Sequence, residues 1–312
     1  MNKKHIKKLI SVILTIFIIV FFIYYFIKNP SILENLRNIS LKSIFLILFI
    51  QFLILVVYSV LNHIVIKKIQ KGVPFQDNLY LQFANTFLNK ILPKGGAAFR
   101  GVYLKEMYNF PYSKFISTLS GMYIVSFLSY SVASFVCFIF FYFKYGLFNI
   151  VLIVAFVGLF LSSLILVFLP TKFFDKKKGK IFQILSSILN GWAEIKGDLK
   201  FIFSLTLIVV GILLLNTFQM QTIYGSLGLQ VSFMPIFFLS VVSLLTIFIN
   251  ITPDGIGIKE GIYVFSSKMV HLASETLILA SLIDRTLGLI IAIIFGGVSY
   301  LILLKKYNKK IK

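Results

Sequence analysis

The chain has 312 residues, of which 59% are hydrophobic and only 13% are charged, and its mean hydropathy is +0.96. This composition excludes a water-soluble globular domain and predicts an all-α polytopic membrane protein. The formal net charge of +21 would indicate a nucleic-acid partner in a soluble protein, but in a membrane protein it bears on topology, so we expect no nucleic-acid partner.

The apolar runs predict about six full membrane spans, because crossing ~30 Å of hydrocarbon takes about 20 helical residues. Two shorter apolar stretches, Phe75–Leu92 and Phe233–Ile249, each precede a motif with proline and glycine. The single cysteine, Cys137, lies in a predicted span, so we expect no disulfide. We interpret residues 1–312 as one transmembrane domain with two halves, 1–170 and 201–312. The predicted spans are Leu9–Ile27, Ser43–Ile66, Lys114–Tyr142, Leu147–Leu169, Phe201–Ile223 and Thr276–Leu304.

The lysines predict the orientation of the chain. They cluster at 3–8, 67–71, 172–180 and 305–312, whereas the loops between these clusters contain few. By the positive-inside rule, both termini are predicted to be cytoplasmic in a multi-pass protein of the cell membrane. Six spans satisfy this orientation if each short stretch and the segment after it enter and leave on the same side.

The cytoplasmic segment 179–198 has apolar side chains on one predicted helical face, among them Ile188, Trp192 and Ile195. We predict an interfacial helix with Trp192 at headgroup level and the preceding basic run near anionic lipids. Such a helix either gathers lipids or acts as a plain topological anchor, and the anchor is the simpler interpretation.

Two polar motifs have the same order of residues. The first reads NKILPKGGAAFR over Asn89–Arg100, and the second reads NITPDGIGIKEG over Asn250–Gly261. With the predicted topology, Phe75–Asn109 starts and ends on the cytoplasmic side, and Phe233–His271 starts and ends outside. The pair therefore predicts two re-entrant broken-helix hairpins in an inverted-repeat-like arrangement, so that seven or eight transmembrane helices can be counted. Either motif alone also fits an ordinary surface loop.

The two hairpins are predicted to build a site for an anionic group near the middle of the membrane. A proline ends each incoming half-helix, glycines allow the turn, and the outgoing half-helix directs its positively polarised N-terminus inward. We interpret Asp254 and Glu260 as counter-ions or proton carriers. The predicted turn residues are Pro93, Gly95, Gly96, Pro253, Gly255 and Gly257. The predicted substrate-binding residues are Asn89, Lys94, Arg100, Asn250, Asp254, Lys259, Glu260 and Arg285.

Other polar residues lie inside the predicted spans. Arg285, next to Asp284, costs ~2.5–3.5 kcal/mol at membrane depth and needs a partner. Glu260 and a lipid phosphate are the candidates, and snorkelling to the outer interface is the alternative. We expect Asn62 and His63 to be interfacial. Asn216, Gln219 and Gln221 are expected in helix packing or at an interface, and Gly288, Gly296 and Gly297 in helix packing.

No enzyme signature emerges. The three histidines are scattered without metal-ligand spacing, and no nucleophile-elbow, Walker or dinucleotide-binding motif is present. We therefore expect no catalytic residue, no metal and no cofactor in this chain.

The two motifs resemble those of the lysylphosphatidylglycerol synthase transmembrane-region family, whose members are also described as flippase-like. ILPKGGAAFRGVYLKE is similar to the family's Leu-Pro, Gly-rich, Arg pattern, and TPDGIGIKEG to its Pro-Gly-Gly-x-Gly-x-Arg-Glu pattern. Arg285 in LIDRTLG matches a later arginine of the family. Lys259 stands where arginine is usual, which keeps the charge but loses bidentate geometry, and Asp254 replaces a glycine. An acidic–basic pair common after the first motif is absent from SGMYIVSF.

The resemblance implies a flippase-like protein that moves an anionic or aminoacylated phospholipid, or a lipid-linked sugar, between leaflets. In bifunctional members a separate soluble domain transfers lysine to phosphatidylglycerol, and we expect this chain to lack that domain. The alternative is a membrane subunit that partners a separately encoded lysyltransferase or glycosyltransferase. A weaker third hypothesis is an integral-membrane enzyme that acts on a lipid phosphate.

Overall fold

A computed structural model describes residues 39–92, 94–146, 150–169, 179–193, 195–249 and 255–311, and all regular structure in these ranges is helical. The predicted span Leu9–Ile27 lies outside the described residues. The first half contains α3 (Leu41–Ile69), α4 (Phe75–Ile91), α5 (Gly95–Tyr108), α6 (Tyr112–Tyr145) and α7 (Ile150–Phe168). After α8 (Lys180–Ala193), the second half contains α9 (Leu199–Ser226), α10 (Phe233–Leu245), the 3-10 turn η2 (Thr246–Ile249), α11 (Ile258–Val270), α12 (Ser274–Ile291), the π-helical segment η4 (Ala292–Gly297) and α13 (Val298–Ile311).

Four of these helical segments are long and apolar enough to cross a membrane. They are α3, α6, α9 and the continuous run from α12 to α13, with 29, 34, 28 and 37 residues. At ~1.5 Å per residue each exceeds the ~30 Å of hydrocarbon in a bilayer. Helix α7 coincides with the predicted span Leu147–Leu169. The prediction of an all-α polytopic membrane protein is confirmed.

The long helices are apolar on both the inner and the outer face. Along α9, Leu205, Val209 and Ile212 are buried, whereas Phe203 and Leu207 are more than half exposed. Such a helix has no polar side because its outer face meets lipid instead of water.

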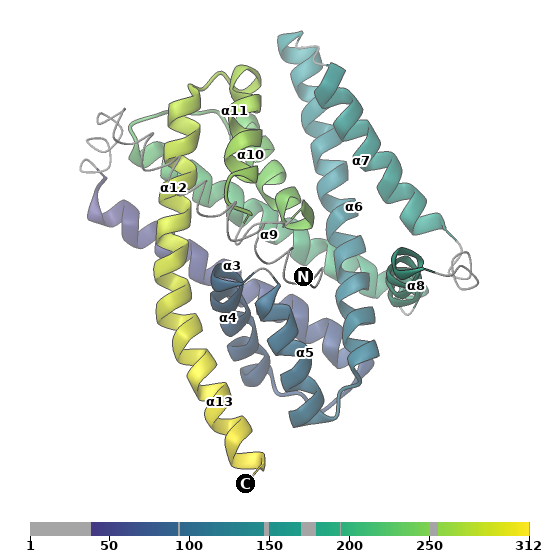
Figure 1. The fold of residues 1–312 in the computed structure, drawn as a ribbon. Helices are drawn as coiled ribbons and strands as arrows, with labels where there is room; N and C mark the ends of the chain where they lie inside the picture. Colours follow the sequence, from purple (N-terminus) through teal and green to yellow (C-terminus); the bar gives the residue numbers. More distant parts are fainter. Residues whose placement is uncertain are drawn as a thin grey trace, which may run out of the picture.

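Two pairs of short helices lie between the long ones, and each pair is a predicted hairpin. Helix α4 packs against α5, and α10 packs against α11. Each half thus has the order long, short, short, long: α3 to α6, then α9 to α12. Across the halves, α10 packs against α6, and α4 packs against η4 and α13. Figure 1 shows α4 and α5 in the lower part of the bundle and α10 and α11 in the upper part, so the hairpins occupy opposite ends.

The turn of the first hairpin depends on a very close contact between its two helices. Lys94 adopts a left-handed conformation (φ 63°) and α5 begins at the next residue. A Cβ atom on Gly96 would lie 2.3 Å from the carbonyl oxygen of Asn85 on α4. Only a glycine allows the backbones to approach this closely. The side chain of Asn89 then closes the turn by accepting the Gly96 N–H at 3.0 Å.

The π-helical segment η4 lets the last span fit against α4. A Cβ atom on Gly296 would lie 2.6 Å from the carbonyl oxygen of Phe83. The packing role predicted for Gly296 is confirmed. A Cβ on Gly288 would meet the side chain of Gln51, whereas one on Gly297 would meet open space. Of the two adjacent glycines in the π-helical segment, Gly296 therefore packs against α4 of the first hairpin, and Gly297 does not.

Helix α8 packs on protein through the face that was expected to meet lipid headgroups. Leu189, Trp192 and Ile195 are buried, and α8 packs against α6. The indole N–H of Trp192 donates to the carbonyl of Val167 at 3.1 Å. The ring of Trp192 is thus covered by protein, which also satisfies its one donor, whereas its depth relative to the lipid headgroups stays a prediction. The basic run at 172–178 lies outside the described residues.

A polar contact outside the apolar core joins the end of α3 to the start of α9. The carboxylate of Asp198 caps α9 by accepting the Phe201 N–H at 3.0 Å, and it pairs with Lys68 of α3 at 2.5 Å. The Lys68 hydrogen bond, with that cap, lowers the pKa of Asp198. Helices α3 and α9 also pack against each other.

We expect Gly96→Ala to lower the free energy of unfolding by about 1–3 kcal/mol, because the new methyl group overpacks the α4–α5 contact. Thermal unfolding of the purified protein in detergent measures this. Gly211→Ala is the matched control, since a Cβ there meets nothing within 4 Å and alanine favours a helix. Equal melting temperatures for Gly96→Ala and the unchanged protein would contradict the close contact.

Candidate functional site

Glu260 and Arg285 form a buried ion pair between α11 and α12. Arg285 Nε donates to Glu260 Oε1 at 2.7 Å, and a terminal guanidinium nitrogen donates to Oε2 at 3.2 Å. Ser281 and the Gly257 N–H also donate to this carboxylate, at 2.6 and 2.8 Å. The carboxylate therefore holds both the following helix and the turn before α11. The ion pair expected for Arg285 is confirmed, and its near-complete burial argues against snorkelling.

A second ion pair lies beside the first. Lys259 Nζ donates to Asp284 Oδ2 at 2.7 Å and lies 5.4 Å from the centre of the Tyr263 ring. Gln219 of α9 donates to Asp284 Oδ1 at 2.6 Å, and Gln51 of α3 donates to the same oxygen at 3.2 Å. Asp284 is thus held by three other helices. The four interior charges of α11 and α12 are thus matched one to one, as burial in an apolar bundle requires.

Arg100, in contrast, is a buried cation without an acidic partner among the described residues. Its exposed fraction is 3%, and one terminal nitrogen donates to the amide oxygen of Asn78 at 2.8 Å. Its Nε has no hydrogen-bond partner among the described residues. A buried guanidinium with a free donor is costly unless an anion or water completes it.

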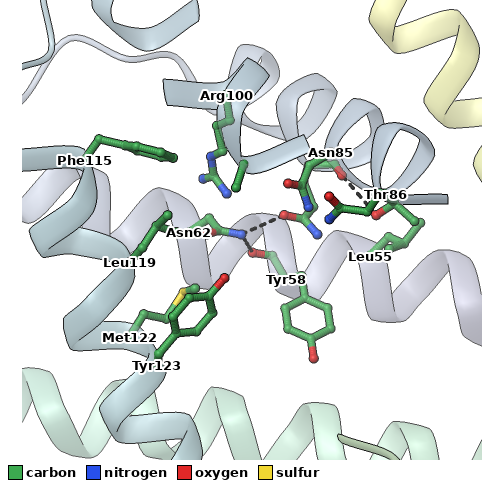
Figure 2. Close-up of a pocket in the computed structure, with 13 residues that line it drawn as sticks. Leu55, Tyr58, Asn62, Asn85, Thr86, Arg100, Phe115, Leu119, Met122 and Tyr123 are labelled. Carbon is green, nitrogen blue, oxygen red and sulfur yellow. Dashed lines mark hydrogen bonds between the residues drawn. The ribbon is translucent and has the colours of Figure 1, made fainter. Parts of the chain in front are cut away.

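The Arg100 cavity, of about 250 Å³, lies between α3, α4, α5 and α6. Figure 2 shows the guanidinium of Arg100 pointing into it toward Asn62, with Asn85 and Phe115 on opposite sides. Asn62 donates to Gln82 at 2.8 Å, which fixes the amides on the floor of the cavity. Apart from Arg100, the polar lining consists of Tyr58, Asn62, Gln82, Asn85, Thr86, Asn89 and Tyr123.

A smaller cavity of about 170 Å³ adjoins the second ion pair. It is lined by Asp284 and Gln219, and also by Gln51 and Lys90. Leu55 and Thr86 line both this cavity and the Arg100 cavity. The tip of α4, which carries Lys90 of the first motif, therefore lies beside Asp284, the ion-pair partner of Lys259 in the second motif.

Comparison with known proteins identifies the family. The family model described as "Lysylphosphatidylglycerol synthase TM region" matches residues 9–296. The chain belongs to this family. A UPF0104 membrane protein of Methanocaldococcus jannaschii is 24% identical over 308 residues, which cover 89% of this chain and 90% of that protein. No solved structure matches the chain.

The motif residues expected from the family pattern have different roles in the structure. Arg100 faces the cavity, and Lys259, Glu260 and Arg285 form the paired network. Asn89 and Gly96 build the α4–α5 turn and Asn89 also lines the cavity. Gly255 and Gly257 have positive φ angles of 65° and 84° next to α11, which favour glycine. Lys94 is exposed and does not line the cavity, and Gly95 is half-buried. Pro93, Asn250, Pro253 and Asp254 lie outside the described residues.

Sequence reasoning missed most of the polar lining of the Arg100 cavity. Asn62 was expected at an interface, but it is 5% exposed and bonded inside the cavity, so that expectation is wrong. The available signal was spacing: Asn78, Gln82, Asn85 and Asn89 follow one face of α4 at intervals of three or four residues. The helix-packing role expected for Gln219 is confirmed by its bond to Asp284.

We expect Glu260→Gln to lower the free energy of unfolding by about 3–5 kcal/mol, because it leaves Arg285 buried without its counter-ion. In the double variant Glu260→Gln with Arg285→Gln, the free energy of unfolding should fall by less than the sum of the decreases in the two single variants. We expect this difference, the coupling energy, to be about 1–3 kcal/mol. Unfolding in detergent measures both. Glu275→Gln, at the exposed start of α12, is the control. Strict additivity would contradict a direct pair.

Proposed function

We propose that this protein moves a lipid with an anionic headgroup between the two leaflets of the cytoplasmic membrane. The observation that carries the proposal is Arg100, a buried cation that has no acidic partner among the described residues and whose guanidinium points into a cavity in the interior of the bundle (Figure 2). A phosphate oxygen is a strong acceptor for such a guanidinium donor. The surrounding amides and hydroxyls replace water around the rest of a headgroup.

The broken helices support translocation rather than static lipid binding. Irregular backbone inside a membrane is tolerated where it lines a cavity, and paired broken helices mark midplane sites in transporters. We propose that the α4–α5 and α10–α11 hairpins enter the membrane from opposite sides. With both termini cytoplasmic, the Arg100 cavity then faces the inner leaflet.

The family description supports a second candidate. The family is named for the membrane region of a synthase. This name favours the alternative that the protein is a membrane subunit that works with a separately encoded lysyltransferase or glycosyltransferase. Co-purification of such an enzyme from native membranes, together with no lipid transfer by the isolated chain, would favour this candidate over the first.

We expect Arg100→Gln to slow lipid transfer by about tenfold to a hundredfold, because a hydrogen bond to a charged group contributes about 1.5–3 kcal/mol. The measurement is leaflet exchange of a phosphatidylglycerol with a fluorescent acyl chain, in vesicles that contain the purified protein. A membrane-impermeant quencher reports how much label remains in the inner leaflet.

The matched control is Lys105→Gln, which removes a positive charge from the exposed side of the same helix and should leave the rate unchanged. Arg100→Lys keeps the charge and should retain part of the rate. Equal rates for Arg100→Gln and the unchanged protein, with both correctly folded, would refute the proposed role of Arg100.

A further inference from the structure

The described lining of the Arg100 cavity carries one positive charge and no negative charge. Arg100 is its one charged lining residue among the described residues, and every other polar group on the described lining is an amide or a hydroxyl. The acidic residues of the nearby network, Glu260 and Asp284, are already bonded to Arg285 and Lys259. The described lining therefore offers a partner for one negative charge and none for an added positive charge.

This inventory distinguishes between kinds of headgroup. A phosphodiester carries one negative charge, and glycerol or sugar hydroxyls can both donate to and accept from amides such as those of Asn62 and Gln82. An ammonium group has three donors and no acceptor, and its buried charge needs a carboxylate. In the Arg100 cavity it would also meet the repulsion of a like charge.

A small apolar side pocket of about 40 Å³ borders the cavity and shares lining residues with it, which favours a lipid over a free phosphate compound. Tyr58, Met122 and Tyr123 line both spaces, and the side pocket adds Leu244 and Phe248 from α10 and η2. Tyr123 and Phe248 are 42% and 37% exposed, with their ring centroids 6.0 Å apart. The lining is thus polar at Arg100 and apolar where α6 faces α10, which suits a polar headgroup next to the start of an apolar chain.

We propose that the Arg100 cavity selects lipids whose phosphodiester carries an uncharged, hydroxyl-bearing headgroup and rejects lipids whose headgroup carries an ammonium. This inference rests on the proposed function for its transport readout, but binding tests it separately. The selection is notable because a lysylated lipid would add ammonium groups to a cavity without a described acid.

The test compares three lipids with the same fluorescent acyl chain: phosphatidylglycerol, phosphatidylethanolamine and lysylated phosphatidylglycerol. We expect phosphatidylglycerol to be exchanged at least about tenfold faster than either ammonium lipid, a difference of about 1.4 kcal/mol. Native mass spectrometry of protein from vesicles with equal amounts of the three lipids should show the same order of retention.

Gln82→Glu is the diagnostic variant. The glutamate keeps an oxygen that can accept from Asn62, so the cavity floor retains its hydrogen bond while gaining a negative charge. We expect the ratio of phosphatidylglycerol to phosphatidylethanolamine rates to fall by at least about tenfold. Gln76→Glu is the matched control, because it makes the same change on an exposed part of α4 and should leave the ratio unchanged.

The outcomes separate this inference from the proposed function. Exchange of all three lipids at equal rates, or faster exchange of the ammonium lipids, overturns the selection but keeps translocation. No exchange of any lipid overturns translocation, and Arg100-dependent retention of phosphatidylglycerol alone would still support the selection. Stabilisation by glycerol 3-phosphate without retention of any lipid overturns the selection, because the ligand is then a free phosphate compound.

Discussion

The structure depends on how an apolar helical bundle accommodates charge. An unpaired buried charge costs several kcal/mol, so an ionic group in the interior needs a partner, either from the protein or from a ligand. Glu260 shows the result most fully, because its carboxylate accepts from Arg285, Ser281 and the Gly257 N–H. One side chain thereby fixes α12, the turn before α11 and the start of that helix. The described end of the second turn, at Gly257, is thus held by the same carboxylate that pairs with Arg285.

The two halves share an order of helices but differ in their use of charge. In the second half, Lys259 and Arg285 are neutralised by neighbouring acids. In the first half, the amide of Asn78 accepts a hydrogen bond from Arg100, and the Nε donor has no partner among the described residues. We infer a division of labour in which the second hairpin is a stabilised scaffold and the first receives the ligand. A similar motif in each half does not imply the same role.

The sequence predicted the hairpins well because their signals are local. Apolar stretches too short to span, followed by proline and glycine, end near the observed limits of α4 and α10, and Asn109 and His271 terminate the outgoing helices. The burial of Trp192 and Asn62 was not predicted, because burial depends on helices far away in the chain. The polar lining of the cavity was missed for the same reason. The amide side chains are regularly spaced along α4, but they line a cavity only because α3 and α6 pack next to that face.

By itself, the sequence determined the class of protein, the long helices and the two breaks, because hydropathy and backbone propensity act over neighbouring residues. Only the tertiary structure decided which charges are paired. Asp284 receives hydrogen bonds from Gln51 and Gln219, which are 233 and 65 residues away in the chain. Arg100 remains available because no described acid folds against it. Short-range electrostatics in a low-dielectric interior depend on distances of a few ångströms, and these distances exist only after the helices have packed.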